Sequence, residues 1–142
     1  MKRFLLLILL CSPLLFTSCE DNYYEEYYYG SVDTYYVTVR PGDWESFGTY
    51  GQDGYILEAG FNANYISPDV IDGGAVLVYY LDPTFGDFQL PYVFSRLVSG
   101  VPSMDIIRYE IYDGGISFII DNLDFKAAPF TSAIDFKVVV IR

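Results

Sequence analysis

The sequence predicts an all-β protein, an antiparallel β-sandwich of the immunoglobulin-like or jelly-roll type with about seven strands. Apolar and polar residues alternate with a period of two in most segments after residue 34, which is typical of half-buried strands. Clusters of Gly, Pro and Asp interrupt these segments at short and nearly regular intervals. Only one short segment, by contrast, carries both a start and a stop signal for a helix.

The expected strands follow one another along residues 34–142, which we take as the folded domain. They are 35–39, 55–61, 75–81, 88–94, 107–111, 116–120 and 134–140. The third of them reads AVLVYYL without interruption, which suits a central strand that is covered on both faces. Pro91 lies inside the fourth and predicts an edge strand or a bulge, because proline has no N–H to donate. Asp113-Gly114-Gly115 predicts a tight hairpin turn between the fifth and the sixth.

A single helical turn is expected near residues 67–72. Ser67 can cap its first N–H groups, Pro68 suits the first helical position, and Gly73 suits the end. A domain of about 110 residues buries roughly two thirds of the surface that its unfolded chain exposes. The sandwich can therefore be stable from its hydrophobic core alone, without a disulfide.

Residues 1–18 have the features of a lipoprotein signal peptide. Met1-Lys2-Arg3 gives a basic start, and the apolar run at residues 4–16 is shorter than the roughly 20 residues that a membrane-spanning helix needs. The next residues, LFTSC at 15–19, resemble a bacterial lipobox, in which the cysteine is acylated and becomes the new N-terminus. The alternatives are an uncleaved signal anchor and a secreted protein with an incidental cysteine.

Lipidation of Cys19 would attach this protein to a membrane. Two or more acyl chains hold a protein on a bilayer stably, whereas one chain holds it only marginally. Cys11 lies in the segment that is removed, so the mature chain has no second cysteine for a disulfide. The sequence therefore predicts an exported outer-membrane lipoprotein, on the cell surface or on the periplasmic face.

Residues 19–33 are expected to form a tether between the lipid and the domain. The segment is acidic and contains five of the 15 tyrosines, all within residues 23–29. Glu20-Asp21, directly after the cysteine, resemble the surface-export signal of Bacteroidota lipoproteins. A solvated linker, a first edge strand and a sticky, tyrosine-rich stalk are the alternatives for this segment.

The charge balance excludes several classes of function. Removal of the signal peptide takes away Lys2 and Arg3 and no acid, so the net charge falls from −11 to −13. Such a chain lacks the clustered basic residues that neutralise phosphate, which excludes nucleic acid as a partner. With no histidine and no free thiol, the common bases and nucleophiles are missing, and we expect no catalytic residue.

A glycine-rich aromatic segment at residues 41–55 is the candidate ligand-binding surface. Exposed Trp and Tyr rings can stack on sugars, and nearby carboxylates can accept hydrogen bonds from sugar hydroxyls. The candidate residues are Asp43, Trp44, Phe47, Tyr50, Asp53 and Tyr55. The alternative for the single tryptophan is a side chain that plugs one end of the core.

No cofactor is expected, and calcium is the alternative. Hard cations bind carboxylate and carbonyl oxygens in loops. Asp82 and Asp87 lie in one expected hairpin loop, and Asp121, Asn122 and Asp124 lie at the end of another strand. Neither loop has the regular spacing of a calcium-binding loop, and Asp and Asn also stabilise turns through their own backbone.

Three segments in order, DGGAVLVY at 72–79, LPYVF at 90–94 and FKVVVI at 136–141, resemble an uncharacterised extracytoplasmic β-domain of Bacteroidota. That domain is found in small lipoproteins and at the ends of collagen-like chains. The resemblance covers about residues 34–142 and implies the fold, but it brings no catalytic residue with it.

Together these features predict a lipid-anchored envelope protein that acts as a non-catalytic binding module, with a glycan or a protein as its partner. A structural or assembly subunit is the second hypothesis, because unprotected sheet edges pair with strands of other chains. The Tyr-rich residues 23–36 are the candidate donated strand. A hydrolase built on a pair of carboxylates is the third hypothesis.

Overall fold

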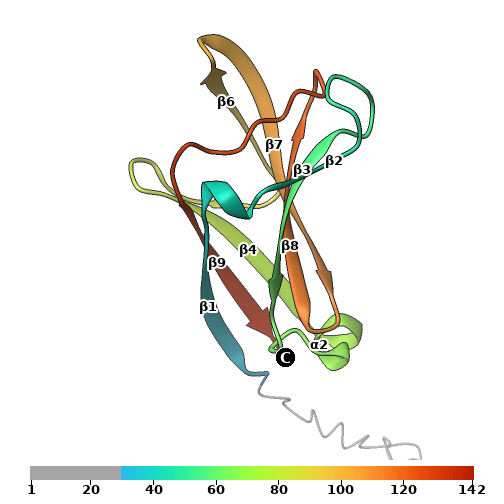
Figure 1. The fold of residues 1–142 in the computed structure, drawn as a ribbon. Coiled ribbons are helices and arrows are strands. Elements are labelled where there is room, and N and C mark those ends of the chain that lie inside the picture. The colour runs from blue at the N-terminus through green and yellow to red at the C-terminus, as the bar shows by residue number, and fades with distance from the viewer. Residues whose placement is uncertain (1–29) are drawn as a thin grey trace, which may run out of the picture.

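Two antiparallel sheets pack face to face in the computed structural model, which describes residues 30–142 (Figure 1). The four-stranded sheet has the spatial order β1 (Val32–Val39), β9 (Ile134–Ile141), β4 (Ala75–Asp82) and β5 (Gly86–Gln89). The five-stranded sheet has the order β2 (Glu45–Phe47), β3 (Ile56–Asn62), β8 (Gly115–Asn122), β7 (Val101–Tyr112) and β6 (Tyr92–Val98). The predicted all-β sandwich is confirmed.

The expected number of strands, about seven, is wrong: the two sheets contain nine within the described residues. The segment 88–94 is two strands, because the chain leaves the four-stranded sheet after β5 and enters the five-stranded sheet at β6. The change of sheet takes place at Leu90, which is buried in the core, and at Pro91. Both strands lie at sheet edges, as Pro91 predicts. The other added strand, β2, is too short to show a period in the sequence.

The core lies between the sheets and is centred on two phenylalanines. The rings of Phe118 in β8 and Phe136 in β9 are fully buried and stacked, with centroids 4.1 Å apart. The strand that is covered on both faces is β8, and not the predicted run 75–81 of β4. In β8 even Ile119, on the outer face, is buried. The reason is its central position, where it lies opposite long side chains of both neighbouring strands.

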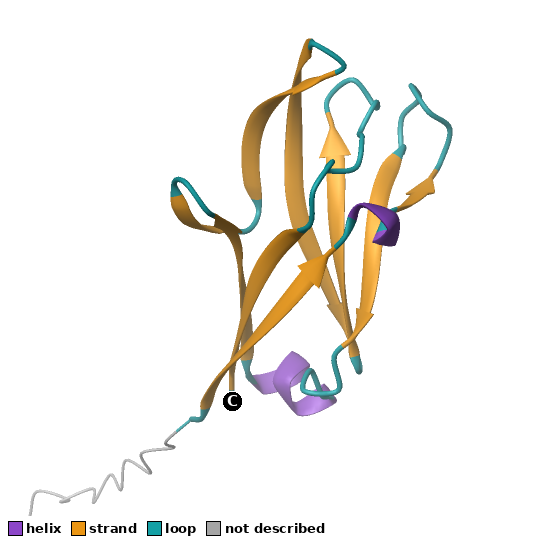
Figure 2. Cartoon of the chain, turned by 60° about the vertical axis from the view of Figure 1, so that its left-hand side comes forward, coloured by secondary structure: helices purple, strands orange, loops and turns teal. Residues whose placement is uncertain are grey.

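The expected helical turn is present as α2 (Pro68–Gly73). Pro68 is its first residue and Ser67 precedes it, although the Ser67 side chain makes no capping hydrogen bond. At the other end, the N–H of Gly74 donates to the carbonyl of Val70 over 3.0 Å. Val70 is the buried residue of α2 and anchors it to the core. Figure 2 shows α2 at one end of the sandwich and most of the longer loops at the other.

The predicted Asp113-Gly114 turn joins β7 to β8. Gly114 has a φ of +74°, a left-handed conformation that favours glycine. The turn is held by the loop before α2, because Ala63 donates to the Gly114 carbonyl over 2.7 Å and Gly114 donates to Ile66 over 2.8 Å. The turn residues therefore position α2 as well as the hairpin.

The first strand includes the last residues of the predicted tether, 32 and 33. β1 begins at Val32 and pairs along its whole length with β9 of the same chain. Residues 32–36 therefore form an edge strand of their own domain in this chain, and the donation of residues 23–36 to another copy stays a prediction. The predicted signal peptide, Cys19 and residues 20–29 lie outside the described residues. Within residues 30–142, no helix reaches the length and hydrophobicity needed to span a membrane.

Candidate functional site

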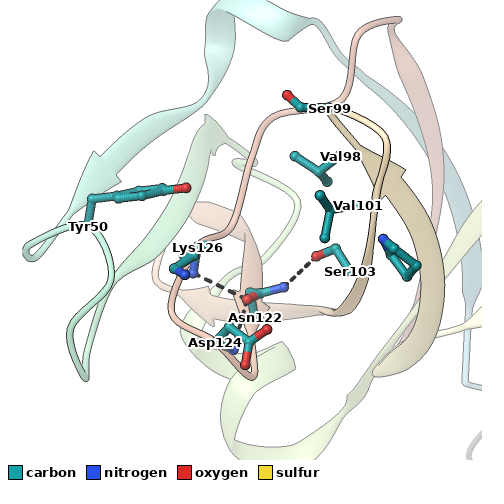
Figure 3. Close-up of a pocket in the computed structure, with 9 residues that line it drawn as sticks. Tyr50, Val98, Ser99, Val101, Ser103, Asn122, Asp124 and Lys126 are labelled. Atoms are coloured by element: carbon teal, nitrogen blue, oxygen red, sulfur yellow. Dashed lines mark hydrogen bonds between the residues drawn. The ribbon is translucent and has the colours of Figure 1, made fainter.

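Three loops at the end of the sandwich opposite α2 surround a hollow of about 310 Å³ (Figure 3). The loops are residues 48–55 between β2 and β3, the turn 99–100 between β6 and β7, and residues 122–126 at the end of β8. The lining residues are Tyr50, Val98, Ser99, Val101, Pro102, Ser103, Asn122, Asp124 and Lys126.

The hollow combines an aromatic ring, an apolar wall and groups of both charges. Figure 3 shows Tyr50 on one side and Val98 and Val101 on the other, with Asp124 and Lys126 on the loop between them. Tyr50 is 63% exposed, so its ring is available to a ligand. An aromatic surface beside a carboxylate and an ammonium group suits a small, polar, ring-shaped ligand.

A buried polar network supports the floor of the hollow. Asp105 of β7 is fully buried, and its carboxylate accepts hydrogen bonds from Arg96 Nε at 2.5 Å and Asn122 Nδ2 at 2.6 Å. It also accepts a hydrogen bond from Ser103 Oγ at 3.0 Å. An unpaired carboxylate in this position would be strongly destabilising. These three hydrogen-bond partners offset that cost. The network thus fixes two of the lining side chains, Ser103 and Asn122.

Asn122 also holds the loop that carries Asp124 and Lys126. Its Oδ1 accepts hydrogen bonds from the backbone N–H groups of Asp124 at 2.9 Å and Lys126 at 3.2 Å. Such side-chain-to-backbone bonds hold a turn in one conformation. The two charged side chains of the hollow therefore project from a loop that the buried network holds in place.

The loop that carries Tyr50 is attached to the same structure. The N–H of Gly51 donates to the carbonyl of Phe125 over 2.8 Å, which joins the two loops directly. The ring of Tyr50 meets that of Tyr55 edge to face, with centroids 5.4 Å apart. Because Tyr55 packs against the core, it supports the exposed ring from below.

Backbone strain is concentrated around this hollow. Among residues 30–142, only two residues other than glycine have a positive φ, Ser99 at +52° and Phe125 at +57°. Ser99 lines the hollow, and Phe125 lies between two of its lining residues, Asp124 and Lys126. A left-handed residue with a side chain costs about 1–3 kcal/mol, and such residues cluster at ligand-binding sites. The strained positions are thus an independent mark of the same site.

The residues predicted for sugar binding are divided by the fold. Tyr50 lines the hollow and Tyr55 supports it, whereas Asp53 is exposed in the same loop outside the lining. Trp44 is half-buried against the core, and its buried Nε1 has no hydrogen-bond partner among the described residues. This position fits the alternative interpretation of Trp44, a side chain that plugs the core. Asp43 caps the 3₁₀ turn η2 (Pro41–Asp43), where its Oδ2 accepts from the N–H of Arg40 at 2.8 Å.

Phe47, the last member of that set, is exposed on the outer face of the five-stranded sheet. It lines a shallow hollow there together with Asp43 and Glu58, away from Tyr50. Of the predicted sugar-binding residues, Tyr50 therefore lines the hollow and Tyr55 packs beneath it, whereas the others lie elsewhere.

The residues considered for calcium are also separated. Asp82 Oδ1 accepts from the N–H groups of Thr84 at 2.8 Å and Phe85 at 2.9 Å, and these bonds, that of Phe85 foremost, lower the pKa of Asp82. Asp87 forms an ion pair with Lys137. Asp121 forms one with Arg108 Nε at 2.6 Å, and Asp124 alone reaches the hollow. Among residues 30–142, no three Asp, Glu, Cys or His side chains come together as a possible metal site.

Sequence reasoning missed the β6–β7 side of the hollow. Val98, Ser99, Val101 and Ser103 were not singled out, although Ser99-Gly100 between two valines is a two-residue hairpin signal. Asn122 was considered only as a calcium ligand, and it acts instead as the cap of its loop.

Comparisons with protein-family models, with curated proteins and with solved structures found no match for this chain. The resemblance to the Bacteroidota β-domain stays a prediction.

Proposed function

We propose that this protein is a non-catalytic binding module that holds a small glycan in the hollow beside Tyr50. The observation that carries the proposal is the convergence of three loops, two of them strained, on one hollow supported by a buried network. A binding site that is already ordered before the ligand arrives loses less entropy when the ligand binds.

The chemistry of the lining favours a sugar. A volume of about 310 Å³ is at the lower end of the range for small-molecule sites, which suits one or two sugar rings. The ring of Tyr50 can stack on the apolar C–H face of a sugar. Asp124 can accept hydrogen bonds from hydroxyl groups, while Lys126 and the hydroxyl of Ser99 can donate them.

The lining also supports binding rather than cleavage. Glycoside hydrolysis needs two carboxyl groups about 5–9.5 Å apart on either side of the scissile bond. Asp124 is the one carboxylate among the lining residues. The nearest buried acid, Asp105, is committed to three hydrogen bonds beneath the floor.

We further propose that the module is an exported lipoprotein attached to the outer membrane through Cys19. β1 begins at the end of the sandwich opposite the hollow (Figure 1). Residues 20–31 can span at most about 40 Å. A lipid at Cys19 would thus hold the domain near the membrane with the hollow directed away from it, accessible to soluble glycans.

The test is a glycan array probed with the full chain, followed by calorimetric titration of the sugars that bind. Tyr50→Ala and Asp124→Asn are expected to weaken binding about tenfold each, which corresponds to 1.4 kcal/mol. Tyr36→Ala is the matched control, because Tyr36 is also a largely exposed tyrosine but lies on β1 in the other sheet. No binding by the wild type, or equal losses in Tyr36→Ala and Tyr50→Ala, would contradict the proposal.

A further inference from the structure

The edge strand β6 leaves one side of its backbone unpaired. It is the last strand of the five-stranded sheet, and within residues 30–142 its only partner is β7. On the outer face, Val93 and Leu97 are 53% and 71% exposed, and Met104 of β7, which pairs with Ser95 between them, is 50% exposed. An edge strand with free N–H and C=O groups and exposed apolar side chains is a ready template for another strand.

A second hollow, of about 620 Å³, lies along this edge. Six successive residues of β6, from Tyr92 to Leu97, line it. Successive side chains of a strand point to opposite faces of the sheet. A hollow that touches all six must therefore lie against the edge of the strand, and not over one face. The other side of the hollow is formed by the β4–β5 hairpin and by the loop before β9, with Phe85, Phe88 and Phe130, so the free edge of β6 faces this hollow.

The strand β6 itself lacks the acidic residues that protect other edges, and Asp82, from the end of β4, is the one acid among the residues that line this hollow. Between Asp87 and Asp105 the sequence has no acidic residue, in a chain of net charge −11. The only charged side chain in that interval is Arg96, and it is paired with Asp105. The remaining edge strands carry acids or are short. β1 contains Asp33, the three-residue β2 contains Glu45, and the four-residue β5 contains Asp87. Two copies of this acidic chain can approach at β6 with least repulsion.

We propose that two copies of this chain pair through β6, antiparallel, around a two-fold axis that is perpendicular to the sheet and passes midway between the two copies of Ser95. This register places Val93 opposite the partner's Leu97 on the outer face, so that two exposed apolar side chains cover each other. On the inner face, Phe94 lies opposite the partner's Arg96, whose charge stays paired with Asp105 of its own copy. The two sheets become one continuous sheet of ten strands, five from each copy.

The sequence of β6 favours a second copy over a foreign strand because it is self-complementary about Ser95. Ser95 meets Ser95 of the other copy, every other pair across the axis contains at least one apolar or aromatic side chain, and no like charges face each other directly. The axis also places both four-stranded sheets on the same side.

The test is disulfide cross-linking of the full chain carrying Ser95→Cys. On the proposed axis the two substituted residues lie directly opposite, at a separation that a disulfide can bridge. Mild oxidation is expected to give a covalent dimer, and peptide mapping by mass spectrometry is expected to find the bond between the two copies at position 95. Mapping separates this bond from any that Cys11 or Cys19 forms. Thr34→Cys, on the exposed edge strand β1, is the matched control and is expected to give no such dimer.

A second substitution distinguishes cross-linking at a specific interface from cross-linking by random collision of two chains. Leu97→Glu, added to Ser95→Cys, buries a charge in the proposed interface and is expected to reduce the cross-linked fraction about tenfold. Tyr36→Glu, which is equally exposed on β1, is expected to leave that fraction unchanged. Both added substitutions are at exposed positions, so thermal unfolding should show intact domains. Absence of the dimer in Ser95→Cys, or a dimer that is insensitive to Leu97→Glu, would overturn the proposal.

Discussion

Replacing Asp105 with alanine removes the acceptor at the centre of the buried network beneath the hollow. Arg96, whose side chain is 18% exposed, then keeps only the carbonyl groups of Ala128 and Pro129 as hydrogen-bond partners. Asn122 and Ser103 each lose a bond as well. Breaking a buried ion pair by removing one partner costs about 3–5 kcal/mol, because the other charge is left unpaired.

We expect the lower end of that range, about 3 kcal/mol, because Arg96 retains two acceptors and some access to water. For a domain of this size, 1 kcal/mol corresponds to roughly 4 °C in the melting temperature, so the expected loss is about 12 °C. The matched control is Asp87→Ala, which removes the exposed ion pair with Lys137 and is expected to cost less than about 1 kcal/mol.

The assay is urea unfolding, followed by far-UV circular dichroism and by the fluorescence of Trp44, the single tryptophan. A double variant, Arg96→Met with Asp105→Leu, provides the second arm of the experiment. It should be more stable than Asp105→Ala, because no unpaired charge is left. If Asp105→Ala cost no more than Asp87→Ala, the argument that this network holds the floor of the hollow would be refuted.

Four further outcomes are expected. Asn122→Ala should weaken glycan binding more than Tyr36→Ala does, measured by calorimetry on folded protein, because it frees the loop that carries the charged side chains. The pKa of Asp82 is lowered, mainly by the N–H of Phe85, so its contribution to stability is present above about pH 4 and is lost as the pH falls through the lower, folded-state pKa. The difference in melting temperature between wild type and Asp82→Asn should therefore shrink in acid, and a constant difference would speak against it. Trp44→Ala should lower the melting temperature strongly, as expected for a side chain packed against the core; an unchanged value would restore the platform hypothesis. Cys19→Ser should move the protein from the membrane fraction to the soluble fraction of cells, and continued membrane attachment would contradict lipidation.

Local sequence signals were sufficient for much of the fold. The period of two identified most of the strands, including β1 and β9, because successive residues of these strands face the core and the outer surface in turn. Ser67-Pro68 and Gly73 marked α2, and Asp113-Gly114 marked the β7–β8 turn, because these residue types have restricted or unusual backbone conformations. Tyr50 was also recognised, as an aromatic residue in a glycine-rich loop.

The remaining features depend on which strands become neighbours. Pro91 predicted an edge, but whether the chain stays in one sheet or crosses to the other is decided by the core that receives Leu90. Likewise the sequence leaves Trp44 open between a binding platform and a core plug, and its partial burial against the core favours the plug. The residues next to Leu90 and Trp44 in the sequence do not determine either the change of sheet or the packing of the tryptophan.

The sequence by itself determined the fold class, the acidic charge and the candidate lipid anchor at Cys19, because each depends on composition or on short-range pattern. Only the tertiary structure decided the site. Arg96, Asp105 and Asn122 lie on three different strands, and the register of β6, β7 and β8 brings them into one hydrogen-bonded network. Antiparallel pairing aligns residues according to the whole sheet, so the hollow and the open edge of β6 exist only once every strand has its neighbours.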